Sequence, residues 1–237
     1  MNATIKTRAI ALCILLALSC KKENGNLQSS RPIDESVRSD LVAGKYPVVK
    51  IGTQKWMARN LDVARYRNGD KIPQVKDSTK WKNLTTGAWC WYNNDSANGA
   101  IYGKLYNWYA VNDPRGLAPI GWHIPTDAEW DTLAWALGGP SVAGGKLKDT
   151  GTIEAGTGLW YAPNVATNSS GFTALPGGDR SNHGPFGNLG YSGFWWSSTQ
   201  VTNRAWYRDL FNYAGFLNKS YTDMRLGSSV RCIKDSI

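Results

Sequence analysis

The chain has 237 residues, a formal net charge of +9, 12 tryptophans and 25 glycines. Its basic residues are scattered instead of forming a stripe, which argues against nucleic acid as a partner, and it contains no apolar run long enough to span a bilayer. Trp packs a large area with few rotatable bonds, and Gly permits tight turns. The composition therefore predicts short strands joined by shaped loops, and argues against a helical bundle.

Residues 1–19 are typical of a lipoprotein signal peptide. A short basic segment precedes an apolar stretch at residues 9–18, about half the length that a membrane-spanning helix needs, which favours a cleaved signal. The sequence Ala17-Leu18-Ser19-Cys20 that follows resembles the lipobox of bacterial lipoproteins. Cys20 is therefore predicted to carry acyl chains, which together give a durable membrane anchor. The alternative is an ordinary secretory signal with a chance cysteine at its end.

Residues 20–43 are predicted to form a flexible polar tether, because so few apolar residues cannot offset the entropy lost on ordering. Lys21-Lys22-Glu23 at its start resembles the charged signals that send some lipoproteins to the outer face. Residues 44–237 are long enough for one domain with a sizeable core. We therefore expect a lipid-anchored protein of the cell outer membrane, with its domain exposed at the surface.

The first elements of the predicted domain are a hairpin and a helix. Residues 46–51 and 54–58 flank the two-residue turn Gly52-Thr53, which suits a tight hairpin. A polar stretch over residues 60–82 is expected to form a long loop. Residues 101–111 have helical apolar spacing, followed by helix-stopping Pro and Gly.

A second helix is predicted after Thr126, where Thr126-Asp127-Ala128-Glu129 forms a capping box. Apolar residues then follow at helical spacing until Gly138-Gly139-Pro140 ends the helix. Trp130 and Trp135 do not share a helix face. Trp130 is expected in the core, and Trp135 nearer the rim.

Strands are predicted over residues 171–175, 194–199, 205–211 and 229–234. In the last of these, alternation places Val230 and Cys232 on one face, with Arg231 and Ile233 on the other. A hairpin, two helices and then several strands with long loops predict an α+β fold class.

Two cysteines remain in the expected mature domain, Cys90 and Cys232. An even pair in an exported domain suggests a disulfide. The alternative is two buried free thiols, because the sequence does not give their separation.

Six ordered motifs between Tyr46 and Asp235 resemble the Fibrobacter succinogenes major paralogous domain, which occurs in exported proteins and lipoproteins of Bacteroidetes-type bacteria. The motifs are Ile51-Gly52-Thr53-Gln54-Lys55-Trp56-Met57, Leu105-Tyr106-Asn107-Trp108, Gly121-Trp122-His123-Ile124-Pro125-Thr126-Asp127, Leu175-Pro176-Gly177-Gly178, Trp195-Trp196-Ser197-Ser198 and Ser229-Val230-Arg231-Cys232. The resemblance implies a C-type lectin-like fold, related to that of formylglycine-generating enzymes. In that fold two helices flank small antiparallel sheets, and long loops present a binding surface.

No catalytic constellation is found, so we expect a binding domain and not an enzyme. The segment Gly144-Gly145-Lys146 fails as a phosphate loop, because Pro140 stands where the first Gly should be and Leu147 replaces the Ser or Thr. His123 is expected to brace the turn before the second helix, the alternative being a base or metal ligand. His183 lies in a Gly-rich loop, and the sequence does not discriminate between an exposed surface histidine and a functional one. No metal or cofactor is predicted, with calcium on the Asn and Asp residues near positions 93–95 and 112–113 left open.

The region from Trp195 to Arg225 combines aromatic and polar residues in the manner of a binding surface. The residues predicted to contact a ligand are Asn203, Arg204, Trp206, Tyr207, Asn212, Tyr213, Asn218 and Tyr221. The favoured ligand is a protein or another cell-surface component. The alternatives are a glycan that stacks on the aromatic rings, and a structural role within a surface assembly.

Overall fold

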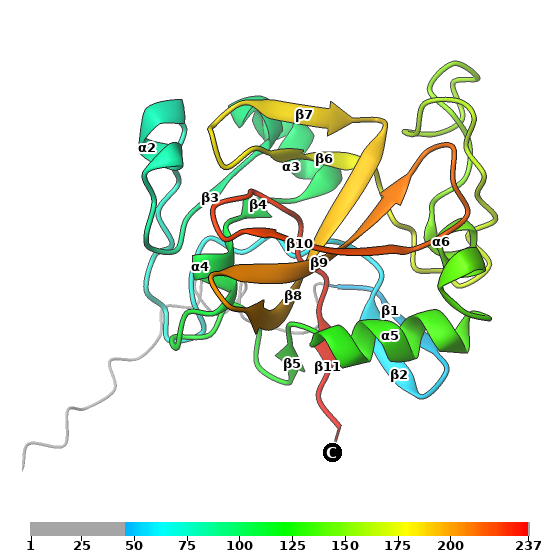
Figure 1. Cartoon of the computed structure of the whole chain (residues 1–237), viewed down its shortest axis with the longest axis horizontal. Coiled ribbons are helices and arrows are strands. Elements are labelled where there is room, and N and C mark those ends of the chain that lie inside the picture. Colours follow the sequence, from blue (N-terminus) through cyan, green and yellow to red (C-terminus); the bar gives the residue numbers. More distant parts are fainter. Residues whose placement is uncertain (1–45, 237) are drawn as a thin grey trace, which may run out of the picture. The chain divides into compact units, whose positions relative to one another are not determined.

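A computed structural model of the chain describes residues 46–236 (Figure 1). The predicted signal peptide, the tether and Cys20 lie outside the described residues. Within that range the fold is mixed α+β, as predicted, with five α-helices and three sheets. None of the helices in this range is long and apolar enough to cross a membrane.

The four-stranded sheet joins the two ends of the described chain. Its strands, in the order β1-β2-β11-β5, are β1 (Val48–Ile51), β2 (Gln54–Met57), β11 (Ile233–Lys234) and β5 (Trp122–His123). The predicted hairpin is confirmed, with Gly52 at φ 59°, a left-handed conformation that suits Gly. Ile233 pairs with Trp56 on one side and His123 on the other.

The five-stranded sheet has the order β10-β9-β8-β6-β7. Its strands are β6 (Gly177–Arg180), β7 (Phe186–Leu189), β8 (Ser192–Val201), β9 (Arg204–Phe211) and β10 (Asn218–Asp223). The strands predicted over 194–199 and 205–211 are confirmed as parts of β8 and β9, which form a long antiparallel pair with a bulge between Trp196 and Gln200. Only β6 and β8 run parallel within this sheet.

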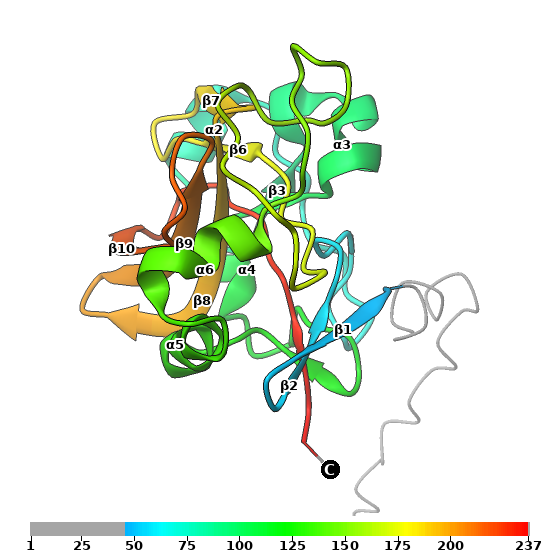
Figure 2. The same cartoon turned by 90° about the vertical axis from the view of Figure 1, so that its right-hand side faces the viewer.

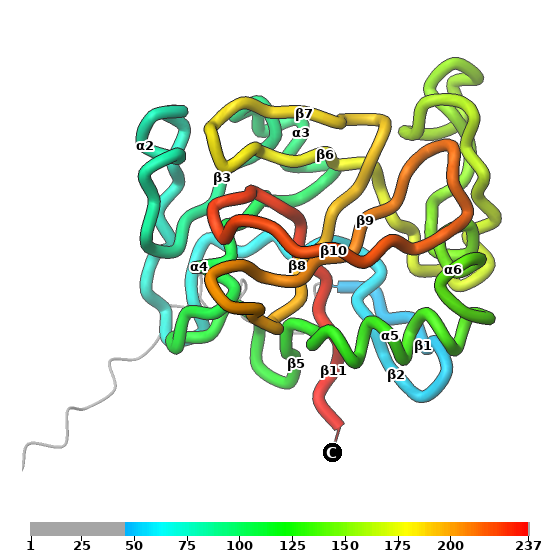
Figure 3. The backbone as a smooth tube through the Cα atoms, in the orientation of Figure 1, coloured from blue at the N-terminus to red at the C-terminus, as the bar shows by residue number. Residues whose placement is uncertain are grey.

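Two predicted strands differ in the structure. Residues 171–175 do not form a strand, because Gly171 (φ 67°) and Thr173 (φ 56°) bend the backbone away from an extended course. The strand predicted over 229–234 shortens to β11, because the preceding residues pair with other sheets. Gly227 pairs with Arg180, Ser228 with Tyr106, and Ser229 with Trp195. Figure 3 shows this C-terminal segment (red) crossing from β10 to β11, so it joins all three sheets.

The helices are α2 (Ser78–Lys82), α3 (Ser96–Tyr102), α4 (Trp108–Val111), α5 (Asp127–Ala136) and α6 (Pro140–Leu147). The remaining sheet pairs β3 (Trp89–Cys90) with β4 (Leu105–Tyr106). The single helix predicted over residues 101–111 is wrong. Gly103 at φ 78° ends α3, β4 follows, and the Asn107 side chain caps α4.

The helix predicted after Thr126 is confirmed as α5, with its capping box formed. Trp130 is 1% exposed and Trp135 is 71% exposed, as their positions on the helix predicted. The two glycines end α5 as expected, with φ of 95° and 97° at Gly138 and Gly139. Pro140 then begins a further helix, α6, that was not predicted.

A buried arginine links the core to the C-terminal segment. Arg231 is fully buried and donates hydrogen bonds to the side-chain oxygen of Asn60 (2.8 Å) and to the main-chain oxygens of Met57 (3.1 Å) and Phe172 (2.5 Å). Its guanidinium lies 4.3 Å from the Phe172 ring centroid. Val230 and Cys232 pack in one hydrophobic cluster and Ile233 in another, which confirms the predicted alternation.

The predicted disulfide is absent, because Cys90 and Cys232 are free thiols. Cys90 packs with Trp81 and Leu105, whereas Cys232 packs in the cluster of Met57 and Trp122. The two cysteines therefore serve different parts of the core. Burial raises the pKa of Cys90 to about 12 and the pKa of Cys232 still higher, so both thiols stay protonated at neutral pH.

Candidate functional site

The residues predicted to contact a ligand lie on the β9–β10 hairpin, at its connecting loop and at the turn before β9 (Figure 1). Strand alternation separates them. Arg204 and Trp206 share one face of β9, and Tyr221 lies opposite Trp206 on β10. Lys219 lies on the same face of β10, opposite Arg208. We call Arg204, Trp206, Lys219 and Tyr221 the hairpin face.

The hairpin face combines aromatic rings with cations. The rings of Trp206 and Tyr221 meet edge to face, with centroids 5.1 Å apart. The Arg204 guanidinium lies 5.7 Å from the Tyr221 centroid, and Lys219 Nζ lies 5.1 Å from the Trp206 centroid. Tyr221 is 47% exposed and Arg204 is exposed. These contacts hold the rings in fixed orientations at the surface.

Helix α5 anchors this face through carboxylates. Buried Arg208 donates to the side chains of Asp127 and Asp131, each at 2.6 Å. Lys219 forms ion pairs with the same two residues, at 2.7 Å and 3.0 Å. The charge of Lys219 is thereby compensated. Within residues 46–236, by contrast, Arg204 forms no ion pair.

Three of the predicted ligand residues make contacts inside the protein. Tyr207 is half-buried against Trp196, with ring centroids 6.3 Å apart. Asn212 is buried and donates to the main-chain oxygens at positions 161 and 162. Asn218 donates to Asp209 Oδ1 at 3.0 Å. In this arrangement these side chains support the sheet, and they do not extend the hairpin face.

The remaining predicted residues lie at opposite ends of the hairpin. Asn203 lines an open recess of about 440 Å³ together with Tyr109, Asp223 and Arg225. Tyr213 lies in the loop after β9 and is 59% exposed. The sequence therefore grouped residues that the fold distributes over three surfaces.

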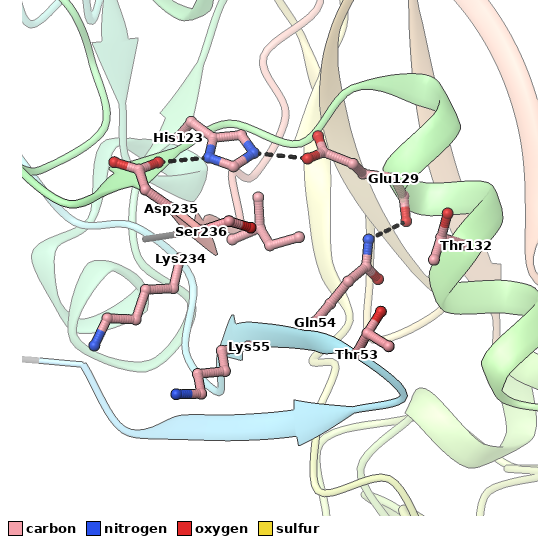
Figure 4. A pocket seen from close by; sticks show the side chains of 10 residues that line it. Thr53, Gln54, Lys55, His123, Glu129, Thr132, Lys234, Asp235 and Ser236 are labelled. Carbon is pink, nitrogen blue, oxygen red and sulfur yellow. Dashed lines mark hydrogen bonds and ion pairs between the residues drawn. The ribbon is translucent and has the colours of Figure 1, made fainter.

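A separate pocket of about 490 Å³ lies between β2, α5 and the end of β11 (Figure 4). His123 is its central side chain. His123 Nδ1 lies 2.7 Å from Asp235 Oδ1, and Nε2 lies 2.8 Å from Glu129 Oε1. Glu129 also closes the capping box of α5 by accepting from Thr126. His123 therefore braces the start of α5, in the manner expected from the sequence, and also holds the end of the C-terminal strand.

The electrostatics of this pocket favour a charged His123. Burial opposes the imidazolium, but hydrogen bonds to Asp235 and Glu129 outweigh it and raise the pKa of His123. Burial likewise opposes ionisation of Glu129, yet its bonds to Thr126 and His123 lower its pKa. Both ring nitrogens are occupied by carboxylates, so neither is available as a base or a metal ligand in this arrangement.

Two of the carboxylates that the sequence offered to calcium have other partners. Asp95 caps α3, and Asp113 pairs with Arg115 at 2.8 Å. Across residues 46–236, no group of three or more His, Cys, Asp and Glu side chains is placed to hold a metal ion. His183 is exposed in the turn between β6 and β7.

Sequence reasoning missed the partners of His123 and the anchoring of Lys219. Asp235 lies 112 residues from His123, and Asp131 lies 88 residues from Lys219. No local pattern reports contacts at such separations. The capping box alone pointed to a part of this site, because it fixed the position of Glu129.

Comparison with known proteins agrees with this organisation. The model of the Fibrobacter succinogenes major domain matches residues 49–234, which run from β1 to the last residue of β11. No curated protein and no solved structure matches the chain. Because the match covers most of the chain, including the sheet that joins its first and last strands, the protein belongs to the Fibrobacter succinogenes major domain family.

Proposed function

We propose that this protein is a lipid-anchored binding domain, displayed on the outer membrane, that recognises a protein or other cell-surface ligand through the hairpin face. The anchor is the lipid expected at Cys20, and the polar segment over residues 20–43 holds the domain away from the membrane.

We further propose that the domain is a variant of the C-type lectin-like fold. Three features support this assignment. The strands β2 and β11, from opposite ends of the domain, pair in one sheet. The helices α5 and α6 follow one another directly. A long stretch without regular structure, residues 148–176, then precedes β6.

The observation that carries the binding proposal is Arg204 beside Tyr221. An exposed guanidinium without a carboxylate partner in the described chain lies against an exposed ring. Arginine binds carboxylates through two parallel hydrogen bonds, and tyrosine offers a large contact area at low entropic cost. This pairing suits an acidic segment of a ligand, whose carboxylate would meet Arg204 while its apolar part packs on Tyr221.

The test uses the purified lipoprotein in detergent and a fluorescent peptide of alternating Glu and Gly, with a Lys and Gly peptide for comparison. We expect the acidic peptide to bind better, and more weakly as salt rises, because surface charges are screened. Arg204→Ala should weaken binding by about tenfold, the loss expected for a charge-assisted hydrogen bond.

Two variants serve as matched controls. Lys50→Ala removes the same charge from exposed β1 and should leave binding unchanged. Tyr221→Phe keeps the ring and should retain most of the binding, whereas Tyr221→Ala should lose it. Equal binding of the two peptides, or equal losses for Arg204→Ala and Lys50→Ala, would contradict the proposal.

A further inference from the structure

We propose a second binding site, for a neutral glycan, at the end of the five-stranded sheet beside α6. Figure 2 views the molecule from this side, where α6 lies close to the loops of residues 148–176. The site consists of the exposed rings of Tyr191 and Tyr213 and the groove next to them. It is separate from the hairpin face and needs a ligand of different chemistry.

Two exposed tyrosine rings are each supported from behind by another ring. Tyr191 is 53% exposed and stacks on Tyr161, with centroids 4.4 Å apart and planes 28° apart. Tyr213 is 59% exposed and stacks on Phe211, at 5.5 Å and 22°. A ring backed in this way keeps its orientation and leaves its outer side available.

Asn212 joins the two stacked pairs. Its main-chain N–H donates to the main-chain oxygen of Tyr191 at 2.9 Å, and its side chain donates to the main-chain oxygen of Tyr161 at 3.3 Å. Asn212 is also the residue that links Phe211 to Tyr213 in the chain. Hydrogen bonds therefore join the backbone segments that carry the two rings.

An open groove of about 590 Å³ lies beside this loop, and its lining includes Gly215, two residues after Tyr213. Its lining also includes Val142, Lys146, Asn164, Val165 and Thr167. The N–H of Val165 donates to the main-chain oxygen of Asn212 at 3.2 Å, which connects the groove to the loop that carries Tyr213. The groove is thus built on the same backbone as the two rings.

The lining of the groove is mostly uncharged. Its lining contains hydroxyl, amide and apolar groups but no carboxylate and no arginine. Its single cation, Lys146, donates to the main-chain oxygen of Leu137 at 2.9 Å. A cationic ligand would find no counter-charge here, and the one ammonium is already held by a main-chain oxygen. A neutral sugar suits the groove, because its C–H face packs on a ring while its hydroxyls meet Asn164, Thr167 and nearby serines.

The experiment is affinity electrophoresis of the purified full-length lipoprotein through gels containing neutral polysaccharides. The panel is hydroxyethylcellulose, mixed-linkage β-glucan, galactomannan and neutral xylan, with polygalacturonate as the acidic comparison. We expect retardation by at least one neutral polymer. Tyr191→Ala and Tyr213→Ala should each weaken it by about tenfold, as for the loss of one ring-stacking contact, and Tyr213→Phe should retain it.

Tyr221→Ala is the matched control, because it removes an equally exposed tyrosine from the hairpin face. It should not change the retardation. A failure of the glycan proposal is therefore distinguishable from a failure of the proposed binding at the hairpin face. Three results would overturn the proposal: no retardation by any neutral polymer, retardation only by polygalacturonate, or equal losses in all three alanine variants. Self-association that Tyr213→Ala abolishes would instead identify this surface as an interface between copies of the chain.

Discussion

The carboxyl group of Asp209 is buried. It lies on β9, is 2% exposed, and accepts one hydrogen bond from Asn218. Burial raises its pKa to about 6, although Asn218 and Arg208 act in the opposite direction. Its neighbour across β8, Asp179, is also buried and has a raised pKa for the same reason. Both carboxyls thus favour the protonated form more than an exposed aspartate does.

This burial predicts a specific dependence of stability on pH. The folded-state pKa of Asp209 lies above the unfolded value of about 3.9. The stabilising effect of the protonated carboxyl is therefore present at low pH and is lost as pH rises from about 4 to about 6, at a cost of about 3 kcal/mol. Asp209→Asn removes the ionisable group and keeps a partner for Asn218, so it should stabilise the domain at pH 8.

Urea denaturation at pH 8 and at pH 4.5 checks this prediction. The free energy of unfolding of Asp209→Asn should exceed that of the wild type at pH 8 and approach it at pH 4.5. A difference of the same size at both pH values would show that packing, and not ionisation, separates the two proteins.

At the scale of single residues, the sequence predicted exposure better than contact. The helical positions of Trp130 and Trp135 indicated which one is buried, because a capped helix fixes its faces. On β9, the sequence could not show that Trp206 and Tyr207 play different roles. The two side chains point to opposite faces of the strand, and the elements that pack on each face decide which side chain is covered. The carboxylates of α5 pack on one face of β9, and Trp196 in the core packs on the other. Both groups lie outside β9 in the sequence, so the local pattern of β9 does not report them.

At the scale of elements, His123 is the point where β5, α5 and the end of the C-terminal strand meet. Its raised pKa has a defined consequence for stability. The stabilising charge is fully present below the unfolded pKa of about 6.5 and is lost as pH rises through the folded pKa. We therefore expect His123→Gln to destabilise the protein more at pH 5.5 than at pH 9.

Two measurements check the role of His123. Urea midpoints of the wild type and of His123→Gln should converge as pH rises, and Asp235→Asn should show a smaller effect of the same sign because the bond to Glu129 remains. An NMR titration should place the pKa of His123 above that of a free histidine. A pKa at or below the free value would refute the account of this clamp.

Elements were predictable where a local signal defined their ends. The capping box and the paired glycines bounded α5, and the Gly-Thr turn bounded the first hairpin. The segment over 101–111 carried helical spacing, but Gly103 and the pairing of β4 with β3 divide it. The short strands β3, β4, β5 and β11 have two residues each and exist through pairing with distant segments, which no periodicity reports.

At the scale of the molecule, the C-terminal segment explains why the core needs an arginine. This segment pairs with all three sheets in turn, and Arg231 within it satisfies carbonyl groups that would otherwise be buried without donors. The same segment holds Cys232 inside the core as a free thiol.

Binding of the fluorescent acidic peptide to intact cells that produce the full chain tests the proposed display and recognition most directly. Wild-type cells should be labelled, whereas cells producing the Arg204→Ala/Tyr221→Ala double variant should not, at equal protein levels by immunoblot. Cells producing Cys20→Ser should lose the label because the unanchored protein is released. Labelling that requires permeabilised cells would contradict surface display. A double variant labelled as brightly as the wild type would contradict recognition through the hairpin face.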